Sequence, residues 1–288
     1  MNEQLHWDKI GHNYNNEIFD VFKSDVKKKL RFYFSKHAGK SKSVIDFGCG
    51  NGKSFSYLSP FFGKILAIDI SQELLNQAKQ RPSQNISFRR TDLSRRNIKL
   101  PPADFLFCCN VVMLPALEKN VIMLKNISDA LKKKASAVLV VPSLESAFFS
   151  SWRLIDWYKR EGVRPEEITA DELHYFKGKK TDSIQGIIYI DNVPTKHYSA
   201  SELEVLFTRS GLKITALDKV EYDWNSEFLS PPKWMKAPYP WDWLVECKIL
   251  KITGSCYLFK LSSIQFLLFK IKSSDCKISS LALVISNG

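Results

Sequence analysis

The stretch VIDFGCGNGKS, residues 44–54, decides the fold of this 288-residue chain. It begins as an apolar run and ends in three glycines at alternate positions, Gly48, Gly50 and Gly52. A chain that leaves a buried strand through a sharp turn often needs positive φ, and a ligand can lie against the backbone only where no Cβ intervenes. Glycine meets both needs, so the stretch predicts a strand followed by a ligand-binding turn.

Two common nucleotide-binding motifs do not fit this turn. The dinucleotide motif GxGxxG requires its last glycine at position 53 or 55, where the chain has Lys53 and Phe55. The phosphate loop that ends in GKS requires its first glycine at position 47, which is Phe47. The glycine spacing therefore argues against NAD and ATP as ligands.

Short apolar runs along the first half of the chain predict a parallel sheet. They occupy residues 43–47, 65–69, 85–90, 103–110 and 135–142. Helical patterns fill the gaps, and near-continuous apolar strands that alternate with helices are typical of a parallel sheet covered on both faces. Residues 213–224 and 240–250 follow without a helix between them, which predicts an antiparallel pair at the edge of the sheet.

The same pattern divides the chain into segments. Residues 1–42 precede the sheet, and residues 43–253 form the main domain. Strands and helices stop alternating at about 143–197, which predicts an insertion rich in aromatic residues. Residues 254–288 follow a fold that is already complete at about residue 250. Their role is left open, including contact with a second subunit.

Composition excludes several classes of protein. Hydrophobic residues at 44% and charged residues at 25% are typical of a globular chain and not of a disordered one. No charge-free stretch approaches the roughly 18 apolar residues of a membrane span. The start lacks the basic and then apolar layout of a secretion signal, so we expect a cytoplasmic protein. The six cysteines include no CxxC pair, so we expect neither a metal site nor a disulfide framework.

The net charge of +12 raises the question of a polyanionic partner. Residues 20–42 carry half of this excess, on a predicted amphipathic helix with an apolar residue at every fourth position. The apolar stripe consists of Ile18, Phe22, Val26, Leu30 and Phe34. Basic residues opposite such a stripe are what solubility alone produces, so we expect a small-molecule partner and no nucleic acid. The arginines at 89, 90, 95 and 96 keep an RNA-binding protein open as an alternative.

The pattern acidic-x-Gly-x-Gly-x-Gly, formed by Asp46 and the three glycines, resembles that of class I S-adenosylmethionine-dependent methyltransferases. The resemblance extends from about residue 5 to about residue 250. It implies a Rossmann-like α/β fold: a seven-stranded, mostly parallel sheet with helices on both faces, an antiparallel last strand and an insertion after strand five. It also implies S-adenosylmethionine as the cofactor and S-adenosylhomocysteine as its product.

The resemblance also assigns roles to individual residues. Asp69 ends the second strand, where a carboxylate accepts hydrogen bonds from both ribose hydroxyls. Asp92 follows the third strand at the place of the adenine amine, and Asn110 follows the fourth at the place of the methionine portion. HWDKIGHNY, residues 6–14, resembles a lid over the sulfonium end. The implied cofactor-binding residues are Trp7, Tyr14, Asp46, Gly48, Cys49, Gly50, Gly52, Asp69, Ile70, Asp92, Leu93 and Asn110.

Methyl transfer from a sulfonium is an in-line displacement with an excellent leaving group. The protein must therefore mainly hold nucleophile and methyl about 3 Å apart and exclude water. A base is needed only when the acceptor loses a proton, and the candidates are His174, Tyr175, His197 and Tyr198. We expect methyl transfer to a small or medium-sized organic acceptor, with the aromatic insertion forming either the acceptor pocket or a private core. An RNA methyltransferase and a non-catalytic scaffold with the same fold stay open as alternatives.

Overall fold

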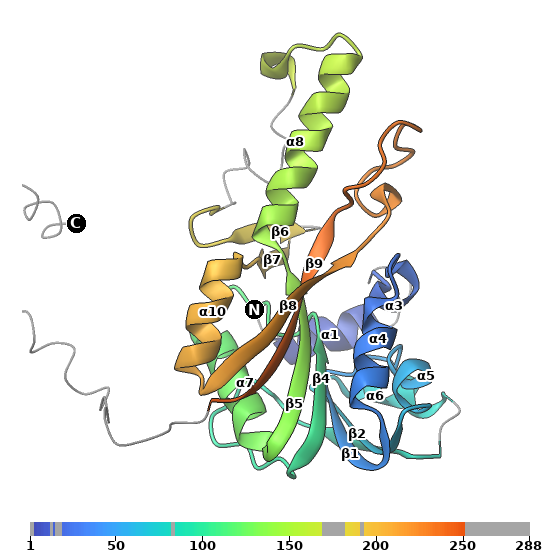
Figure 1. The fold of residues 1–288 in the computed structure, drawn as a ribbon, viewed down its shortest axis with the longest axis vertical. Coiled ribbons are helices and arrows are strands. Elements are labelled where there is room, and N and C mark those ends of the chain that lie inside the picture. Colours follow the sequence, from blue (N-terminus) through green and yellow to red (C-terminus); the bar gives the residue numbers. More distant parts are fainter. Residues whose placement is uncertain are drawn as a thin grey trace, which may run out of the picture. The chain divides into compact units, whose positions relative to one another are not determined.

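The computed structural model describes residues 3–11, 14, 19–81, 84–168, 182–190 and 193–250 (Figure 1). The chain divides into two units, residues 1–250 and residues 251–288. The predicted tail at 254–288 lies outside the described residues, as do His174 and Tyr175.

The main sheet has seven strands in the order β3-β2-β1-β4-β5-β9-β8 (Figure 1). Strands β1 to β5 are parallel, whereas β9 runs antiparallel to both β5 and β8. This order confirms the predicted Rossmann-like fold with an antiparallel last strand. The strands are β1 (Gly39–Phe47), β2 (Phe62–Asp69), β3 (Ile86–Arg90), β4 (Ala103–Cys109), β5 (Leu131–Pro142), β8 (Leu212–Glu221) and β9 (Trp241–Ile249).

The strand order reverses between β1 and β4. The chain passes from β1 outward to β2 and β3, and then returns to place β4 on the other side of β1. Asp46 of β1 is level with Ala67 of β2 and with Phe107 of β4. The loops that leave β1 and β4 diverge here, which opens the crevice at which open α/β sheets bind ligands.

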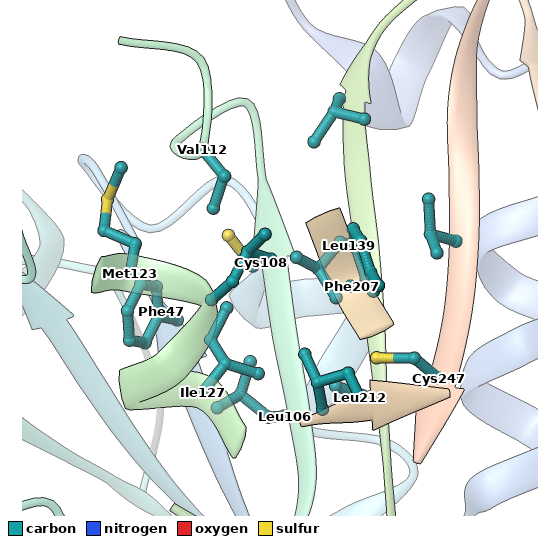
Figure 2. Close-up of a cluster of buried hydrophobic side chains, with 14 of the residues drawn as sticks. Phe47, Leu106, Cys108, Val112, Met123, Ile127, Leu139, Phe207, Leu212 and Cys247 are labelled. Atoms are coloured by element: carbon teal, nitrogen blue, oxygen red, sulfur yellow. The ribbon is translucent and has the colours of Figure 1, made fainter. Parts of the chain in front are cut away.

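Helices cover both faces of the sheet. On one face, α7 (Leu117–Ala130) and α10 (Ala200–Arg209) enclose a buried cluster, in which Ile127 and Phe207 pack with Leu106 and Leu139 (Figure 2). On the other face lie α3 (Val21–Ser24), α4 (Lys29–His37) and α5 (Phe55–Leu58), which contribute to a second cluster. Successive residues of β5 alternate between these clusters, which explains its unbroken apolar sequence. The other described helices are α1 (Glu3–Gly11), α6 (Gln72–Lys79) and α8 (Leu144–Arg160), with single turns at Pro165–Glu167 and Trp224–Ser226.

The prediction of one continuous helix before the sheet is wrong. The chain breaks between α3 and α4, where Asp25 Oδ2 accepts a hydrogen bond from the Leu30 amide at 2.9 Å. Lys28 adopts a left-handed φ of 53°, which a continuing helix does not allow. Val26 therefore leaves the apolar stripe and is 45% exposed. A side-chain acceptor that competes with the helical backbone explains the break.

The described part of the predicted insertion consists of α8, which extends beyond the carboxyl edge of the sheet, and a separate hairpin (Figure 1). The hairpin pairs β6 (Ile187–Ile190) with β7 (Val193–Lys196). The aromatic face of α8 packs on the connection between β8 and β9, since the ring of Phe149 lies 5.5 Å from that of Trp224 and 6.0 Å from that of Trp241. The aromatic residues of α8 thus share a cluster with the β8–β9 connection.

Candidate functional site

A cavity of about 1000 Å³ lies over the carboxyl ends of the strands. Its floor includes Gly48 after β1, Asn110 after β4 and Asp242 at the start of β9. Residues of α1 and α3 and of the β6–β7 hairpin complete its walls. The wall and floor residues most relevant to its chemistry are Trp7, Lys9, Tyr14, Phe19, Asp46, Gly48, Cys49, Lys53, Asn110, His197, Tyr222, Glu227, Trp241 and Asp242.

The glycine turn has the backbone geometry that the sequence predicts. Gly48, Gly50 and Gly52 all have positive φ, at 85°, 54° and 81°. A Cβ on Gly48 would lie 2.2 Å from Val111 Cγ2, and one on Gly50 would lie 2.5 Å from the Tyr14 hydroxyl oxygen. The first two of these positions thus need glycine for both conformation and space.

Asp46 ties the start of the turn to its end. It is buried, and its Oδ2 accepts a hydrogen bond from the hydroxyl of Ser54, which follows the third glycine. Burial raises the pKa of Asp46 to about 7, the hydrogen bond from Ser54 opposes this shift, and the charge of Asp69 adds to it. The residue therefore closes the loop and lines the cavity floor at once.

Asp69 holds the turn from the end of β2. Its Oδ2 accepts from the Gly50 amide at 2.8 Å and its Oδ1 from the Ser71 amide at 2.9 Å. Burial raises the pKa of Asp69, while these backbone hydrogen bonds favour its charged form. Both oxygens thus act on the protein backbone, and Asp69 itself is not part of the cavity lining.

Six of the predicted cofactor residues lie outside the cavity lining, namely Gly50, Gly52, Asp69, Ile70, Asp92 and Leu93. Asp92 Oδ1 accepts from the amide and hydroxyl of Ser94, at 3.0 and 2.7 Å, and Oδ2 pairs with Arg95. Leu93 is buried in the main core, and Ile70 follows β2. The structure therefore gathers half of the predicted set at the cavity and leaves the other half outside its lining. The gathered residues are Trp7, Tyr14, Asp46, Gly48, Cys49 and Asn110.

Trp7 and Tyr14 both line the cavity, with their ring centroids 6.5 Å apart. Tyr14 lies against Gly50, and burial raises its pKa well above the ordinary value. Helix α1 is anchored on α6, because Asp8 Oδ1 accepts from the Ser71 hydroxyl at 2.5 Å and Gln77 Nε2 donates to the Gly11 carbonyl at 2.7 Å. The N-terminal helix thus covers the cavity beside the glycine turn.

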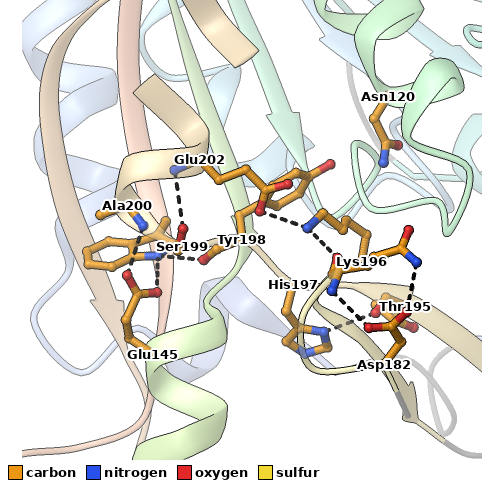
Figure 3. A network of polar contacts seen from close by, with 12 residues as sticks. Asn120, Glu145, Asp182, Thr195, Lys196, His197, Tyr198, Ser199, Ala200 and Glu202 are labelled. Atoms are coloured by element: carbon orange, nitrogen blue, oxygen red, sulfur yellow. Dashed lines mark hydrogen bonds and ion pairs between the residues drawn. The ribbon is translucent and has the colours of Figure 1, made fainter. Parts of the chain in front are cut away.

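Only one of the four predicted base candidates lines the cavity among the described residues. His197 lies on its wall, and its Nδ1 is 3.1 Å from the Thr195 carbonyl oxygen (Figure 3). The ring nitrogen that faces a carbonyl must carry the hydrogen, which leaves Nε2 as an acceptor. Burial lowers the pKa of His197 to about 4, and the Lys196 charge adds to this effect, so the imidazole is neutral at pH 7.

Tyr198 points into the protein core. Its side chain is 1% exposed and belongs to the cluster under α7 and α10 (Figure 3). Burial raises its pKa well above the ordinary value. The prediction that Tyr198 is a base is therefore wrong, because adjacent residues of an extended chain face opposite sides and His197 takes the cavity side.

Sequence reasoning missed Asp242 and Tyr222. Tyr222 donates its hydroxyl hydrogen to Asp242 Oδ2 at 2.7 Å, and Asn110 Nδ2 lies 3.5 Å from the same oxygen. Burial raises the pKa of Asp242, and both hydrogen bonds oppose this shift. The available signal was the motif PWDW, residues 240–243, in which a carboxylate interrupts the start of an apolar strand.

Among the described residues, no group of three or more His, Cys, Asp or Glu side chains has the geometry to hold a metal ion. No helix in the described part of the chain is long and apolar enough to cross a membrane.

The reversed strand order, the glycine turn at the reversal and the antiparallel last strand define the class I S-adenosylmethionine-dependent methyltransferase fold, and this chain has it. The cofactor of this class is S-adenosylmethionine. Within the class, residues 44–134 match the family described as the methyltransferase domain.

Two curated proteins are similar to part of the chain. A Saccharomyces cerevisiae protein described as an S-adenosylmethionine-dependent methyltransferase is 35% identical over 68 residues, which are 24% of this chain and 22% of that protein. Protein 235L of Invertebrate iridescent virus 6, described as a methyltransferase, is 28% identical over 110 residues, 37% of this chain and 39% of that one. The chain thus spans well under half the length of these curated relatives.

Solved structures extend the likeness over most of the chain. The crystal structure of an S-adenosylmethionine-dependent methyltransferase from Anabaena variabilis has a TM-score of 0.58 and 17% sequence identity. The match covers 86% of this chain and 93% of that one. At this identity the likeness establishes the fold.

Proposed function

We propose that this protein transfers a methyl group from S-adenosylmethionine to a small or medium-sized organic acceptor by in-line displacement. The observation that carries the proposal is the glycine turn at the strand reversal, which opens directly into the cavity. Cavities that bind small molecules measure roughly 300–1000 Å³, so this one has room for a cofactor and a modest acceptor together.

The residues present fit the cofactor. Gly48 presents backbone without a side chain to the cavity, and Asp69, which holds the turn through the Gly50 amide, would supply a carboxylate for the ribose hydroxyls. Trp7 and Tyr14 would cover the sulfonium and exclude water, and the backbone carbonyl of Asn110 would meet the methionine portion. When bound, the cofactor supplies the electrophilic methyl group, and the protein aligns the acceptor with it.

The placement of the basic residues favours a small acceptor over RNA. Lysines of the basic segment 20–42 pair with carboxylates of β8 and β9, in the pairs Lys27–Glu221, Lys29–Asp218 and Lys36–Glu246 at 2.6, 2.6 and 2.8 Å. These ion pairs hold α4 and the turn that precedes it to the sheet, and the carboxylates neutralise the charges of the three lysines. The observation supports a structural role for the basic segment.

Calorimetry with S-adenosylhomocysteine, NAD and ATP tests the cofactor assignment. We expect binding of the first and no appreciable binding of the others. Asp69→Asn should weaken binding by about 10- to 150-fold, as expected for lost hydrogen bonds to a charged acceptor. Asp129→Asn, the same change on the exposed face of α7, is the control. Equal or tighter binding of NAD overturns the proposal.

Two further measurements separate the alternatives. A titration with transfer RNA at several salt concentrations should show weak binding that disappears at moderate salt. A logarithmic slope that corresponds to six or more phosphates, with sub-micromolar affinity near physiological salt, would instead support an RNA substrate. Cofactor binding without methyl transfer to any member of a broad acceptor panel would support a scaffold.

A further inference from the structure

Asp242 lies on the acceptor side of the cavity. The strand order runs from β1 through β4 and β5 to β9, so about 14 Å of sheet separates Asp242 from the glycine turn. It is level with Pro142 at the end of β5, on the side of the sheet opposite to β2 and β3. If the adenosine lies toward β2 and β3, as the proposed function requires, Asp242 faces the opposite end of the cofactor.

The two carboxylate oxygens of Asp242 differ in their hydrogen-bond partners. Tyr222 and Asn110 both serve Oδ2, and among the described residues Oδ1 has no hydrogen-bond donor. No lysine, arginine or histidine side chain in the described part of the chain pairs with this carboxylate. The neighbouring Asn110 Oδ1 is also buried without a partner. Two neighbouring oxygen acceptors therefore have no donor from the described part of the chain.

The number of hydrogens that a group can donate to these two oxygens distinguishes the possible methyl acceptors. A hydroxyl brings one hydrogen, whereas a primary amine or ammonium brings two or three, enough for both oxygens. Aromatic rings line the same end of the cavity, where Phe19 packs edge-on against Tyr222 with centroids 4.8 Å apart and Trp241 precedes Asp242. Rings beside a carboxylate favour a cationic or amine group over a neutral one.

We propose that Asp242 and Asn110 hold the amine of the methyl acceptor, so that the acceptor is a small organic amine. This inference rests on the proposed function and narrows it. The carbon–nitrogen bond forms as the carbon–sulfur bond breaks and leaves its electron pair on sulfur, and Asp242 accepts the proton that the nitrogen gives up. Asp242 is thus both the binding group and the proton acceptor.

The test measures binding of small amines to the protein saturated with S-adenosylhomocysteine. The probes are 2-phenylethylamine and cyclohexylamine, each paired with the alcohol of the same skeleton. We expect the wild-type protein to bind at least one amine 10-fold or more tightly than its alcohol. Asp242→Asn keeps the shape and an acceptor for Tyr222, and it should reduce amine affinity at least 10-fold while S-adenosylhomocysteine affinity and melting temperature stay unchanged. Asp129→Asn is the matched control and should change none of these values.

Each of the following outcomes would contradict either the inference or the proposed function. Loss of S-adenosylhomocysteine affinity in Asp242→Asn would assign the carboxylate to the cofactor and overturn the inference. Equal affinity for amines and alcohols, or unchanged amine affinity in the variant, overturns it as well. Failure of the wild-type protein to bind S-adenosylhomocysteine at all would contradict the proposed function, and it is visible before any amine is added.

Discussion

At the scale of single residues, two positions with nearly the same backbone conformation differ in what surrounds them. Gly48 has a φ of 85° and Val111 directly against it, whereas Gly162 has a φ of 84° and nothing within 4 Å of its virtual Cβ. The pair therefore separates the cost of the left-handed conformation from the cost of crowding.

Gly162→Ala should lower the free energy of unfolding by about 1–2 kcal/mol, the cost of the left-handed region for an L-residue. Gly48→Ala should lose at least about 2 kcal/mol more, because its methyl group meets a branched side chain that cannot move freely. Urea denaturation of both variants measures the difference. Equal losses would mean that the turn relaxes around the new methyl group.

Asp46 should make stability fall as pH rises. Its folded pKa of about 7 lies above the ordinary pKa of 3.8 of the free side chain, so the folded protein binds a proton between about pH 4 and 7 that the unfolded chain releases. The contribution is fully present below the lower value and is lost as pH passes the higher one. Asp46→Asn should remove roughly 2–4 kcal/mol of the decline in unfolding free energy between pH 5 and pH 8.

The control for this prediction is Asp104→Asn. The pKa of Asp104 is lowered to about 2 by hydrogen bonds from Lys132 and Ser43, so this group is ionised throughout the same range in both states. Its removal should leave the slope between pH 5 and pH 8 unchanged. Urea denaturation at both pH values decides the matter, and identical slopes for the wild type and Asp46→Asn would show that Asp46 is ionised in the fold.

At the scale of elements, α1 connects the cofactor turn to α6. Asp8 accepts from the Ser71 hydroxyl, which also caps α6, and Asp69 accepts from the amide of the same serine. One residue thus links the lid, the first turn of a helix and the end of β2. Displacement of α1 would disturb all three contacts.

Asp8→Asn should loosen α1 and speed the dissociation of S-adenosylhomocysteine by about 10-fold, since it weakens hydrogen bonds to a charged acceptor. Stopped-flow displacement measures this rate, and hydrogen exchange of residues 3–11 should rise in parallel. Gln72→Ala, in the first turn of α6, removes only an exposed contact to Asn76 and should change neither. An unchanged rate with increased exchange would mean that α1 does not retain the cofactor.

Elements were predictable from sequence where one local pattern decides them. The apolar runs of β1, β2 and β4 and the glycine turn needed no distant partner to be recognised. The break between α3 and α4 depends on one side-chain hydrogen bond from Asp25, which an apolar stripe does not reveal. Asp242 could not be predicted as a site residue, because the hydrogen bonds that position it come from Tyr222 and Asn110, which are 20 and 132 positions away.

At the scale of the whole molecule, the seven-stranded sheet is complete well before residue 288. All described residues that line the cavity precede position 243, and β9 ends at Ile249. Residues 1–250 form one compact unit. A chain that stops after Thr253 should therefore fold and bind S-adenosylhomocysteine with unchanged affinity. Calorimetry and thermal melting test this, and loss of soluble protein on truncation would show that residues 254–288 are needed by the fold or by a dimer.

The position of β9 has a consequence for synthesis. β9 lies between β5 and β8 and pairs with residues 137–142, although it is made about 100 residues after them. Until it leaves the ribosome, the outer edge of β5 is an unpaired apolar strand, the kind of edge that other chains join. Because β9 also carries Asp242, the strand that removes this aggregation hazard brings the acceptor carboxylate with it. A nascent chain thus acquires its proposed amine site only when β9 pairs with β5 and covers this apolar edge.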